Sequence, residues 1–424
     1  MKSYKIIRVA GLHYQKLKEE LSKKISSMTY QEQQKYIFEK AYVYSDSFSK
    51  NMEKLHHHAS EIIYDLSFHQ KKWAEENSFN YTNSQWQRDI LIAQLKYFKP
   101  EVVFFQDIHS LSYKDFVDLK KMVPSIRCLV MFRGYPGLTA NELKTLSLAD
   151  LLLVGSPKIL QKTVQLGLNA KLIYHSFDSS ILNKLKNGLE KKPFTFLGSS
   201  GYGCGISHLE RYIFLQKLLE KTNIRLWIEE SPFIGKKTLK DFIRSFLTFF
   251  FEKISLNHLP SLAKIIPFVR INKIINQIYE EKKIVLNSNL SYPLTPLSKF
   301  FSPRCHKPLF GIEMYQLFHD SSLTFNIHSC AAKGFVDNMR LFQATGCGSC
   351  LVTDTGENLP DLFEPDSEVV TYSTFEECRE KIDFLLNNEK ERIKIAKRGQ
   401  QRVLNYHTAY HRVQEINQLL QEFL

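Results

Sequence analysis

Short apolar runs alternate with amphipathic helical segments between residues 87 and 174. The runs are rich in Val, Leu and Phe, which is typical of strands buried on both faces of a parallel sheet. We expect strands at 102–105, 127–132, 151–154 and 171–174, and helices at 87–98, 113–122, 140–147 and 157–166. Strands that alternate with helices at this spacing predict βαβ units and therefore an α/β fold with a parallel sheet. Upstream, we expect one strand at 4–10, followed by a polar, helix-rich region to about residue 77.

The same alternation starts again after a polar connection at 177–193, which we interpret as an interdomain linker. The second set has expected strands at 194–197, 224–228, 323–328, 351–354 and 368–372, and expected helices at 208–220, 310–319, 375–387, 389–406 and 407–423. We therefore predict two doubly wound, Rossmann-like domains, residues 1–180 and residues 181–406, with residues 407–424 as a final helix. With 424 residues, the chain is long enough for two domains.

The stretch from His328 to Asp354 reads as a loop, a short helix at 339–345 and a buried strand. Asn338 is the expected N-cap of the helix, and Gly346 or Gly348 can take the positive φ of its C-cap. The start of a helix at the rim of a parallel sheet presents free N–H groups and a partial positive charge, which suit a phosphate. Any βα unit would show the same pattern, so this stretch alone does not decide a function.

Two cysteine- or glycine-rich motifs carry weaker signals. The glycine-rich turn at 198–205 follows an expected strand, but it lacks the Lys-Ser/Thr ending of a P-loop and fits no dinucleotide fingerprint. Cys347 and Cys350 are the only close cysteine pair, and no second pair of ligands follows at metal spacing. We therefore interpret both cysteines as small buried residues and expect no metal site.

Residues 231–306 break the strand–helix rhythm and are expected to form a helical insert in the second domain. One helix face in this insert is aromatic, and Lys and Arg residues lie near the start of that helix. The aromatic residues are Phe242, Phe246, Phe249 and Phe250, and the basic ones are Lys236, Lys237, Lys240 and Arg244. Such a face is typical of a subdomain that packs on its own core. The alternative is an interfacial helix that associates peripherally with an anionic membrane through residues 236–285.

The formal net charge of the chain is +13, which favours anionic partners such as nucleotides, acidic glycans, lipid surfaces or nucleic acid. No basic-aromatic recognition motif accompanies the charge, so we do not expect a nucleic-acid partner. The odd number of cysteines and the charged N-terminal segment favour a cytoplasmic location, either free or peripheral at the inner membrane face.

The C-terminal third resembles glycosyltransferases of group 1 of the type found in the spore maturation protein CgeB. The resemblance lies in the segments DNMRLFQATGCGSCLVTD, LPDLFEPDSEVVTY and HTAYHR, with a looser match through the first domain and none across 231–306. It implies the GT-B fold, in which two Rossmann-like domains face each other across a cleft and the last helix crosses back to the first domain. It also implies a nucleoside-diphosphate sugar as co-substrate and a glycan, lipid-linked glycan or protein as acceptor. No cofactor or metal is expected, because the chain has no Asp-x-Asp motif.

The resemblance also places candidate residues for binding the donor in the second domain. Asp337, Asn338 and Arg340 match the start of the family's donor helix, where amides and a guanidinium hold the diphosphate. Gln343 stands where the family has a Glu that accepts the ribose hydroxyls, and Phe335 stands where the broader group has another Glu. The remaining candidates for contact with the donor are Gly198, His208, Arg211, Asn326 and His328.

In the first domain, Asp107, His109 and Arg133 follow two expected strands at their carboxyl ends, where ligands bind in such sheets. Asp107 or His109 would take the proton of the acceptor hydroxyl in an inverting reaction. A retaining reaction, which is usual for group 1 enzymes, needs no dedicated base. Three functions remain open at this point. They are a glycosyltransferase, a catalytically weak binding protein of the same fold, which Gln343 and Phe335 favour, and a nucleic-acid binder, which only the net charge suggests.

Overall fold

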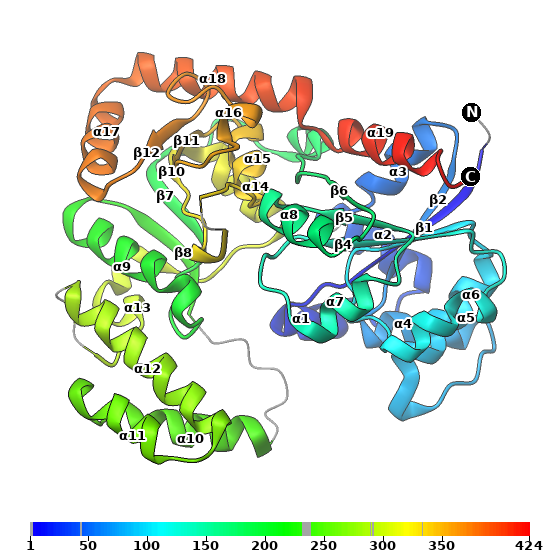
Figure 1. Cartoon of the computed structure of the whole chain (residues 1–424). Helices are drawn as coiled ribbons and strands as arrows, with labels where there is room; N and C mark the ends of the chain where they lie inside the picture. Colours follow the sequence, from blue (N-terminus) through cyan, green and yellow to red (C-terminus); the bar gives the residue numbers. More distant parts are fainter. Residues whose placement is uncertain (1–2, 43–44, 231–238, 289, 291, 333) are drawn as a thin grey trace.

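The structure is a computed structural model that describes residues 3–424 except 43–44, 231–238, 289, 291 and 333; the side chains of 239–245 are also not described. Two α/β domains lie side by side, and a small helical lobe extends from the second one (Figure 1). The prediction of two doubly wound domains is confirmed, because each domain contains a parallel sheet of six strands.

The first sheet has the order β2-β1-β3-β4-β5-β6. Its strands are β1 (Lys5–Ala10), β2 (His58–Ile63), β3 (Val102–Phe105), β4 (Cys128–Arg133), β5 (Leu151–Val154) and β6 (Ala170–Leu172). The helices around it are α1 (Gln15–Ile25), α2 (Tyr30–Glu39), α3 (Ser47–Lys54), α4 (Ser67–Glu76), α5 (Trp86–Phe98), α6 (Tyr113–Met122), α7 (Ala140–Leu146) and α8 (Pro157–Gln165). Both faces are covered, because Val103 and Phe105 join one buried cluster and Val102 and Phe104 join another.

The second sheet has the order β12-β11-β10-β7-β8-β9, and all its neighbouring strands are parallel. Its strands are β7 (Lys192–Ser199), β8 (Arg225–Glu229), β9 (Cys305–His306), β10 (Ser321–Phe325), β11 (Cys350–Asp354) and β12 (Val370–Tyr372). Its helices are α9 (Ile206–Lys221), α14 (Gly311–Asp320), α15 (Arg340–Gly346), α16 (Leu359–Leu362), α17 (Phe375–Asn387) and α18 (Glu389–Tyr406). The strand order reverses between β7 and β10, and ligands of open α/β sheets bind at the carboxyl ends of strands at such a reversal.

The insert forms a helical lobe that we define as α10 (Leu239–Glu252), α11 (Leu259–Ile265), α12 (Val269–Asn287) and α13 (Leu297–Phe300). The end of the expected insert differs from the structure, because Cys305 and His306 form β9 and pair with β8 in the second sheet. None of the described helices is long and apolar enough to cross a membrane.

The chain passes between the domains twice, and the two crossings lie side by side. Phe177, in the linker, donates its N–H to the carbonyl of His407 at 2.9 Å, and its own carbonyl accepts the N–H of Ala409 at 2.8 Å. Beyond this point α19 (Ala409–Leu420) packs on α3 and on the first sheet, close to both chain ends in Figure 1. The phenyl ring of Phe177 is fully buried, so the two crossings are part of one packed connection.

Candidate active site in the cleft between the two sheets

A cleft with a volume of about 470 Å³ lies between the two domains. The first domain contributes Asp107, after β3, and the segment 132–136, at the end of β4. The second domain contributes the ends of β7 and β10, the start of α9 and the segment 337–340 before and into α15. The cleft therefore includes the carboxyl ends of the two strands at which the second sheet reverses its order.

Nine of the twelve candidate residues from the sequence line this cleft: Asp107, Arg133, Gly198, His208, Arg211, Asn326, Asp337, Asn338 and Arg340. His109, His328 and Gln343 lie outside its lining. Residues more than 200 positions apart in the sequence meet here because they follow the carboxyl ends of strands, and the carboxyl ends of both sheets face the cleft.

Arg340 opens α15 and lies half-buried in the wall of the cleft. Its Nε donates to the carbonyl of Leu197 at 3.2 Å, and Nη1 donates to the side-chain oxygen of Gln343. No described carboxylate forms an ion pair with it. Burial lowers the pKa of Arg340 from its ordinary value. A buried cation without a counter-ion is costly, and an anion in the cleft would offset that cost.

Arg211 presents a second guanidinium at the cleft that forms no ion pair with a described carboxylate. Its Nη2 donates to the carbonyl of Ile327 at 3.0 Å, whereas its Nε is buried and has no hydrogen-bond partner among the described residues. Burial lowers its pKa, although the carboxylate of Asp354 acts in the opposite direction. Arg211 thus leaves donor capacity free at the cleft.

His208 lies one turn before Arg211 on α9. Burial first and the charge of Arg211 second lower the pKa of His208 to about 4, so its imidazole is neutral at pH 7. Its Nδ1 is buried without a partner in the described part of the chain. The helix begins after Gly205, which has a φ of 76° and no side chain to cap the first N–H groups. The start of α9 therefore offers uncapped backbone donors as well as His208 and Arg211.

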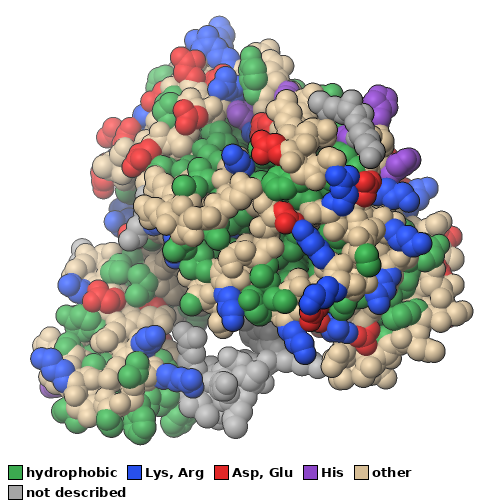
Figure 2. Space-filling model, turned by 45° about the vertical axis from the view of Figure 1, so that its right-hand side comes forward, with side chains coloured by type: hydrophobic (Ala, Val, Ile, Leu, Met, Phe, Trp, Pro, Cys, Tyr) green, Lys and Arg blue, Asp and Glu red, His purple; other side chains and the backbone are tan. Residues whose placement is uncertain are grey.

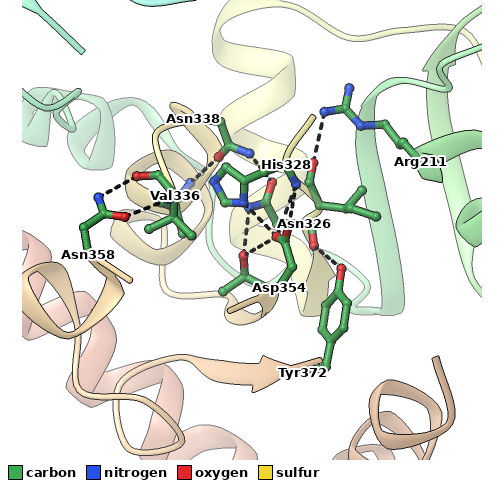
Figure 3. A network of polar contacts seen from close by, with 11 residues as sticks. Arg211, Asn326, His328, Val336, Asn338, Asp354, Asn358 and Tyr372 are labelled. Atoms are coloured by element: carbon green, nitrogen blue, oxygen red, sulfur yellow. Dashed lines mark hydrogen bonds and ion pairs between the residues drawn. The ribbon is translucent and has the colours of Figure 1, made fainter. Parts of the chain in front are cut away.

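A hydrogen-bonded network holds the loop after β10 against the end of β11 (Figure 3). Asn338 donates its side-chain amide to the Asn326 side-chain oxygen at 2.9 Å, and Asn326 donates to the hydroxyl of Thr353 at 3.0 Å. His328 donates its backbone N–H to both carboxylate oxygens of Asp354, and its Nδ1 lies 2.7 Å from one of them. The network fixes these side chains before any ligand arrives, which lowers the entropy cost of binding.

His328 lies outside the cleft lining, because Asp354 holds its ring behind the loop. The same contact fixes the tautomer: the Nδ1–H donates to Asp354, so Nε2 carries the lone pair in the neutral ring. Nε2 is buried and without a partner among the described residues. Asp354, which follows directly after the Leu-x-Thr motif, was not among the candidates from the sequence although it controls this histidine.

Gln343, expected to accept the ribose hydroxyls, lies outside the lining of the cleft. Its side chain is buried, its oxygen accepts the hydrogen bond from Arg340, and its amide donates to the Tyr315 hydroxyl at 3.2 Å. In this structure Gln343 therefore holds the guanidinium of Arg340, and its contact with the ribose stays a prediction. The expected N-cap also differs slightly, because α15 begins one residue later; the Asn338 side chain still accepts the N–H of Leu341 at 3.3 Å.

Asp337, the acidic candidate of the second domain, lies half-buried in the cleft beside Ser156 of the first domain. Burial raises its pKa, whereas the neighbouring His328 and the Ser156 hydroxyl lower it less strongly. Its Oδ2 is buried without a hydrogen-bond donor in the described residues. A carboxylate repels a phosphate, so this side chain suits a sugar hydroxyl, whereas the contact that we expected with the diphosphate is through backbone amides.

Asp107 lies at the first-domain side of the cleft and already has three donors. The Tyr64 hydroxyl donates to Oδ2, His13 Nε2 lies 3.2 Å from the same oxygen, and the His109 N–H donates to Oδ1 at 2.8 Å. The last bond turns the chain so that the His109 imidazole points to solvent, 3.7 Å from Glu142. His109 is therefore outside the cleft for a local reason, the tight turn that Asp107 closes.

His13 and Tyr14 are residues that the sequence analysis missed. They lie in the segment after β1, at the same strand edge as Asp107. The Tyr14 phenol also lies close enough to Arg340 that each affects the pKa of the other. The signal was present, because Gly11 ends an apolar strand just before them.

Arg133, by contrast, is neutralised locally: its Nη2 lies 3.0 Å from Glu142 and also donates to the carbonyl of Gly137.

The described residues contain no group of three or more His, Cys, Asp or Glu side chains that could hold a metal ion. Cys347 and Cys350 are both buried free thiols, and burial raises the pKa of Cys350 to about 12. Neither thiol is a reactive thiolate at neutral pH.

Comparisons with known proteins now bear on this geometry. Residues 290–418 match a family described as glycosyl transferase-like. Three similar structures cover almost the whole chain. Anabaena HepE, in a complex with UDP-glucose, is 13% identical with a TM-score of 0.54 and covers 99% of this chain and 100% of its own. A glycosyltransferase from Rickettsia africae is 9% identical with a TM-score of 0.53 and covers 100% of this chain and 99% of its own. Sucrose-phosphate synthase from Thermosynechococcus elongatus is 10% identical with a TM-score of 0.53 and covers 99% of this chain and 98% of its own. No curated protein sequence is significantly similar to this chain.

The chain has the GT-B fold. The expectation of this fold is confirmed, including two Rossmann-like domains of six parallel strands each. At these identities the similarity establishes the GT-B architecture alone, so the roles of individual residues rest on the contacts described above.

Proposed function

We propose that this GT-B protein is a glycosyltransferase that moves a sugar from a nucleoside-diphosphate sugar to an acceptor. The observation that carries the proposal is the pair Arg211 and Arg340: two half-buried arginines line one cleft, and neither forms an ion pair with a described carboxylate. A diphosphate supplies the missing counter-charge. The match of residues 290–418 to a glycosyl transferase-like family supports the same reading.

In the proposed complex, the diphosphate lies between Arg340 and the start of α9, where Arg211 and the uncapped N–H groups are its donors. As the bond between the sugar C1 and the phosphate oxygen breaks, its electron pair moves to that oxygen, and the two guanidinium groups stabilise the growing charge. Asp337 and Asn338 lie at the same wall of the cleft and would orient the sugar through its hydroxyls. The cations supply this stabilisation directly, so we propose that transfer requires no metal ion.

The acceptor would enter from the first domain, between Asp107 and the segment 132–136. Both oxygens of Asp107 already accept hydrogen bonds and the His109 ring points to solvent, so neither base candidate is well placed to take the proton of an acceptor hydroxyl. This favours a retaining reaction, in which the new C1–O bond forms on the face that the phosphate leaves and the hydroxyl proton passes to the departing phosphate oxygen. The acceptor class, a glycan, a lipid-linked glycan or a protein, is the open part of the proposal, and we retain the CgeB-like type as a prediction.

The decisive experiment measures nucleoside diphosphate released from a panel of sugar nucleotides, beginning with UDP-glucose because Anabaena HepE was captured with it. Slow hydrolysis, or faster release with an added glycan or lipid-linked acceptor, is the expected result. A lack of binding of any sugar nucleotide would overturn the proposal.

A second candidate function is binding without turnover. It is favoured by one specific observation: neither Phe335 nor Gln343 presents a carboxylate to the cleft, where the family pattern has glutamates. Intact binding of a sugar nucleotide with no release of diphosphate under any acceptor condition would select this function.

A further inference from the structure

The helical lobe carries exposed apolar side chains at its tip. Where α11 ends and α12 begins, the exposed fractions are 75% for Ile265, 64% for Phe268 and 69% for Val269. Ile265 and Val269 have the two highest exposed fractions of any large apolar side chain in the described part of the molecule. Lys264 and Arg270, both exposed, flank this segment directly.

A second exposed apolar group lies on the outer side of α10. Phe246, Phe249 and Phe250 have exposed fractions of 62%, 59% and 55%. Lys253 follows one turn later on the same face, with its Nζ 4.1 Å from the ring centroid of Phe249. Figure 2 shows hydrophobic side chains along the lower edge of the lobe, with Lys and Arg side chains beside them.

The lobe does not need these side chains for its own core. Phe251, Leu259, Ile275 and Ile278 already form a buried cluster, with Leu247, Ile254 and Leu262 packed against it. The expected subdomain with its own core is therefore present, and the exposed group is additional to it. Exposed apolar side chains that gather in one place mark an interaction surface.

The charges beside this surface indicate what kind of partner it fits. Lys253, Lys264, Arg270 and Lys273 are exposed, and none of them forms an ion pair with a described carboxylate. Apolar side chains that protrude between free cations match an anionic bilayer, in which the apolar groups enter the acyl boundary and the cations contact lipid phosphates. A protein partner would have to supply a cavity for a protruding loop and acids around it.

We propose that the tip and outer side of the helical lobe dock on the surface of an anionic membrane. Ile265, Phe268 and Val269 insert, together with the Phe246–Phe249–Phe250 face, while Lys264 and Arg270 contact the headgroups. Lys236 and Lys237, which we also expected to take part, lie outside the described residues, as do the side chains of Lys240 and Arg244, and the proposal does not use them. It is independent of the proposed glycosyl transfer, because no residue of the lobe tip lines the cleft.

The test is co-sedimentation of the full chain with vesicles of phosphatidylcholine containing about one third phosphatidylglycerol, compared with vesicles of phosphatidylcholine alone. We expect binding to the anionic vesicles that weakens as salt is added. The triple variant Ile265→Ser, Phe268→Ser and Val269→Ser should lower the partition coefficient by at least about tenfold, because three inserting side chains are lost. The double variant Lys264→Glu and Arg270→Glu should remove the preference for anionic vesicles.

The matched control is Val164→Ser with Leu166→Ser, two exposed apolar side chains of the first domain with exposed fractions of 54% and 55%. This control should bind vesicles as the unmodified protein does. All variants should keep the thermal unfolding midpoint of the unmodified protein.

Equal vesicle binding by the triple variant and the unmodified protein would overturn the proposal. It would also be overturned if the unmodified protein were a dimer that the triple variant breaks, because the surface would then join two copies. Release of diphosphate without vesicles should be the same for the triple variant, which separates a failure of this inference from a failure of the proposed function.

Discussion

At the scale of single residues, the cleft is distinguished by two arginines, Arg211 and Arg340, that form no ion pair with a described carboxylate. Arg133 lies in the same cleft but is paired with Glu142 at 3.0 Å, so its charge is already compensated. Arg340 contacts a carbonyl, an amide oxygen and the ring of Phe318, with its Cζ 5.5 Å from that ring centroid, and it forms no ion pair with a described carboxylate. The difference between these two arginines separates a structural cation from one that is available to a ligand.

Replacing Arg340 by Ala should weaken donor binding. We expect the dissociation constant of the nucleoside diphosphate to rise by about tenfold or more, which corresponds to about 1.4 kcal/mol for a lost charge-assisted contact. Isothermal titration calorimetry measures this change. Arg304→Ala is the control, because Arg304 also donates to backbone carbonyls, those of Thr222 and Leu219, but lies away from the cleft. An equal effect of both substitutions would show that Arg340→Ala acts through the fold.

A substitution at Gln343 distinguishes its observed position from the expected one. In the structure its side-chain oxygen faces Arg340, so Gln343→Glu should form an ion pair with this guanidinium and compete with the diphosphate. The dissociation constant of the donor should therefore rise several-fold, as measured by the same titration. A tighter complex would contradict the account and return this residue to the ribose contact that the family pattern implies.

At the scale of elements, the helix that carries Arg340 is held by contact with the linker. A Cβ atom at Gly346, the last residue of α15, would lie 2.5 to 2.8 Å from three ring atoms of Phe177. The glycine therefore lets α15 pack directly on the segment that joins the domains. Gly348, two residues later, has a φ of 85° and ends the turn, as the glycine pattern predicted.

Gly346→Ala should accordingly destabilise the protein by about 1 to 3 kcal/mol, because the buried ring of Phe177 has no room to move aside. Urea unfolding followed by circular dichroism gives the change. In the double variant Gly346→Ala with Phe177→Leu, the smaller side chain should restore part of the lost stability. Additive effects of the two substitutions would mean that the two groups are not in contact.

The strand and helix order could be predicted from the sequence where the hydrophobic pattern is strong. The bounds of α17 and α18 match the predicted ones, because both helices are amphipathic and begin after Thr374 or Asn388. Strand β2 was missed, because His58, Ser60 and Glu61 make its first half polar. Glu61 is nevertheless buried, and its carboxylate lies 2.6 Å from Arg8 on the neighbouring strand. A strand that is buried through an ion pair with its neighbour lacks the apolar residues by which hydrophobic patterns identify buried strands.

The candidate site was predictable to the level of strand ends and motifs, but not to the level of side-chain direction. His109 follows β3 as expected, yet the Asp107–His109 hydrogen bond turns its ring to solvent. Gln343 lies on the expected helix, yet it faces Arg340 instead of the cleft. Both outcomes depend on local hydrogen bonds within two or three residues, which spacing alone does not specify.

At the scale of the whole molecule, four histidines whose pKa burial lowers make stability depend on pH. Burial lowers the pKa of His69 to about 3 and that of His175, His208 and His407 to about 4, with nearby arginines adding to the effect for the last three. In the unfolded chain these groups titrate near 6.5. Between about pH 4 and 6.5 the unfolded chain therefore binds more protons, and the free energy of unfolding falls as the pH is lowered through this window.

The free energy of unfolding should thus be lower at pH 5.5 than at pH 7, measured by urea titration at both values. His69 is fully buried, and a single such group contributes a slope of about 1.4 kcal/mol per pH unit below 6.5. His69→Gln removes one titrating group and should make the dependence shallower. A variant with the same slope as the unmodified protein would contradict the assignment of a neutral buried imidazole.

The central claim is that the two guanidinium groups of the cleft grip the diphosphate of a sugar nucleotide. A crystal structure of the protein with the nucleoside diphosphate that calorimetry selects tests this most directly. The account predicts phosphate oxygens within hydrogen-bond distance of both Arg211 and Arg340, with the sugar side facing Asp337 and the first domain. A nucleotide bound elsewhere, or a saturated crystal in which both guanidinium groups face an empty cleft, would contradict it.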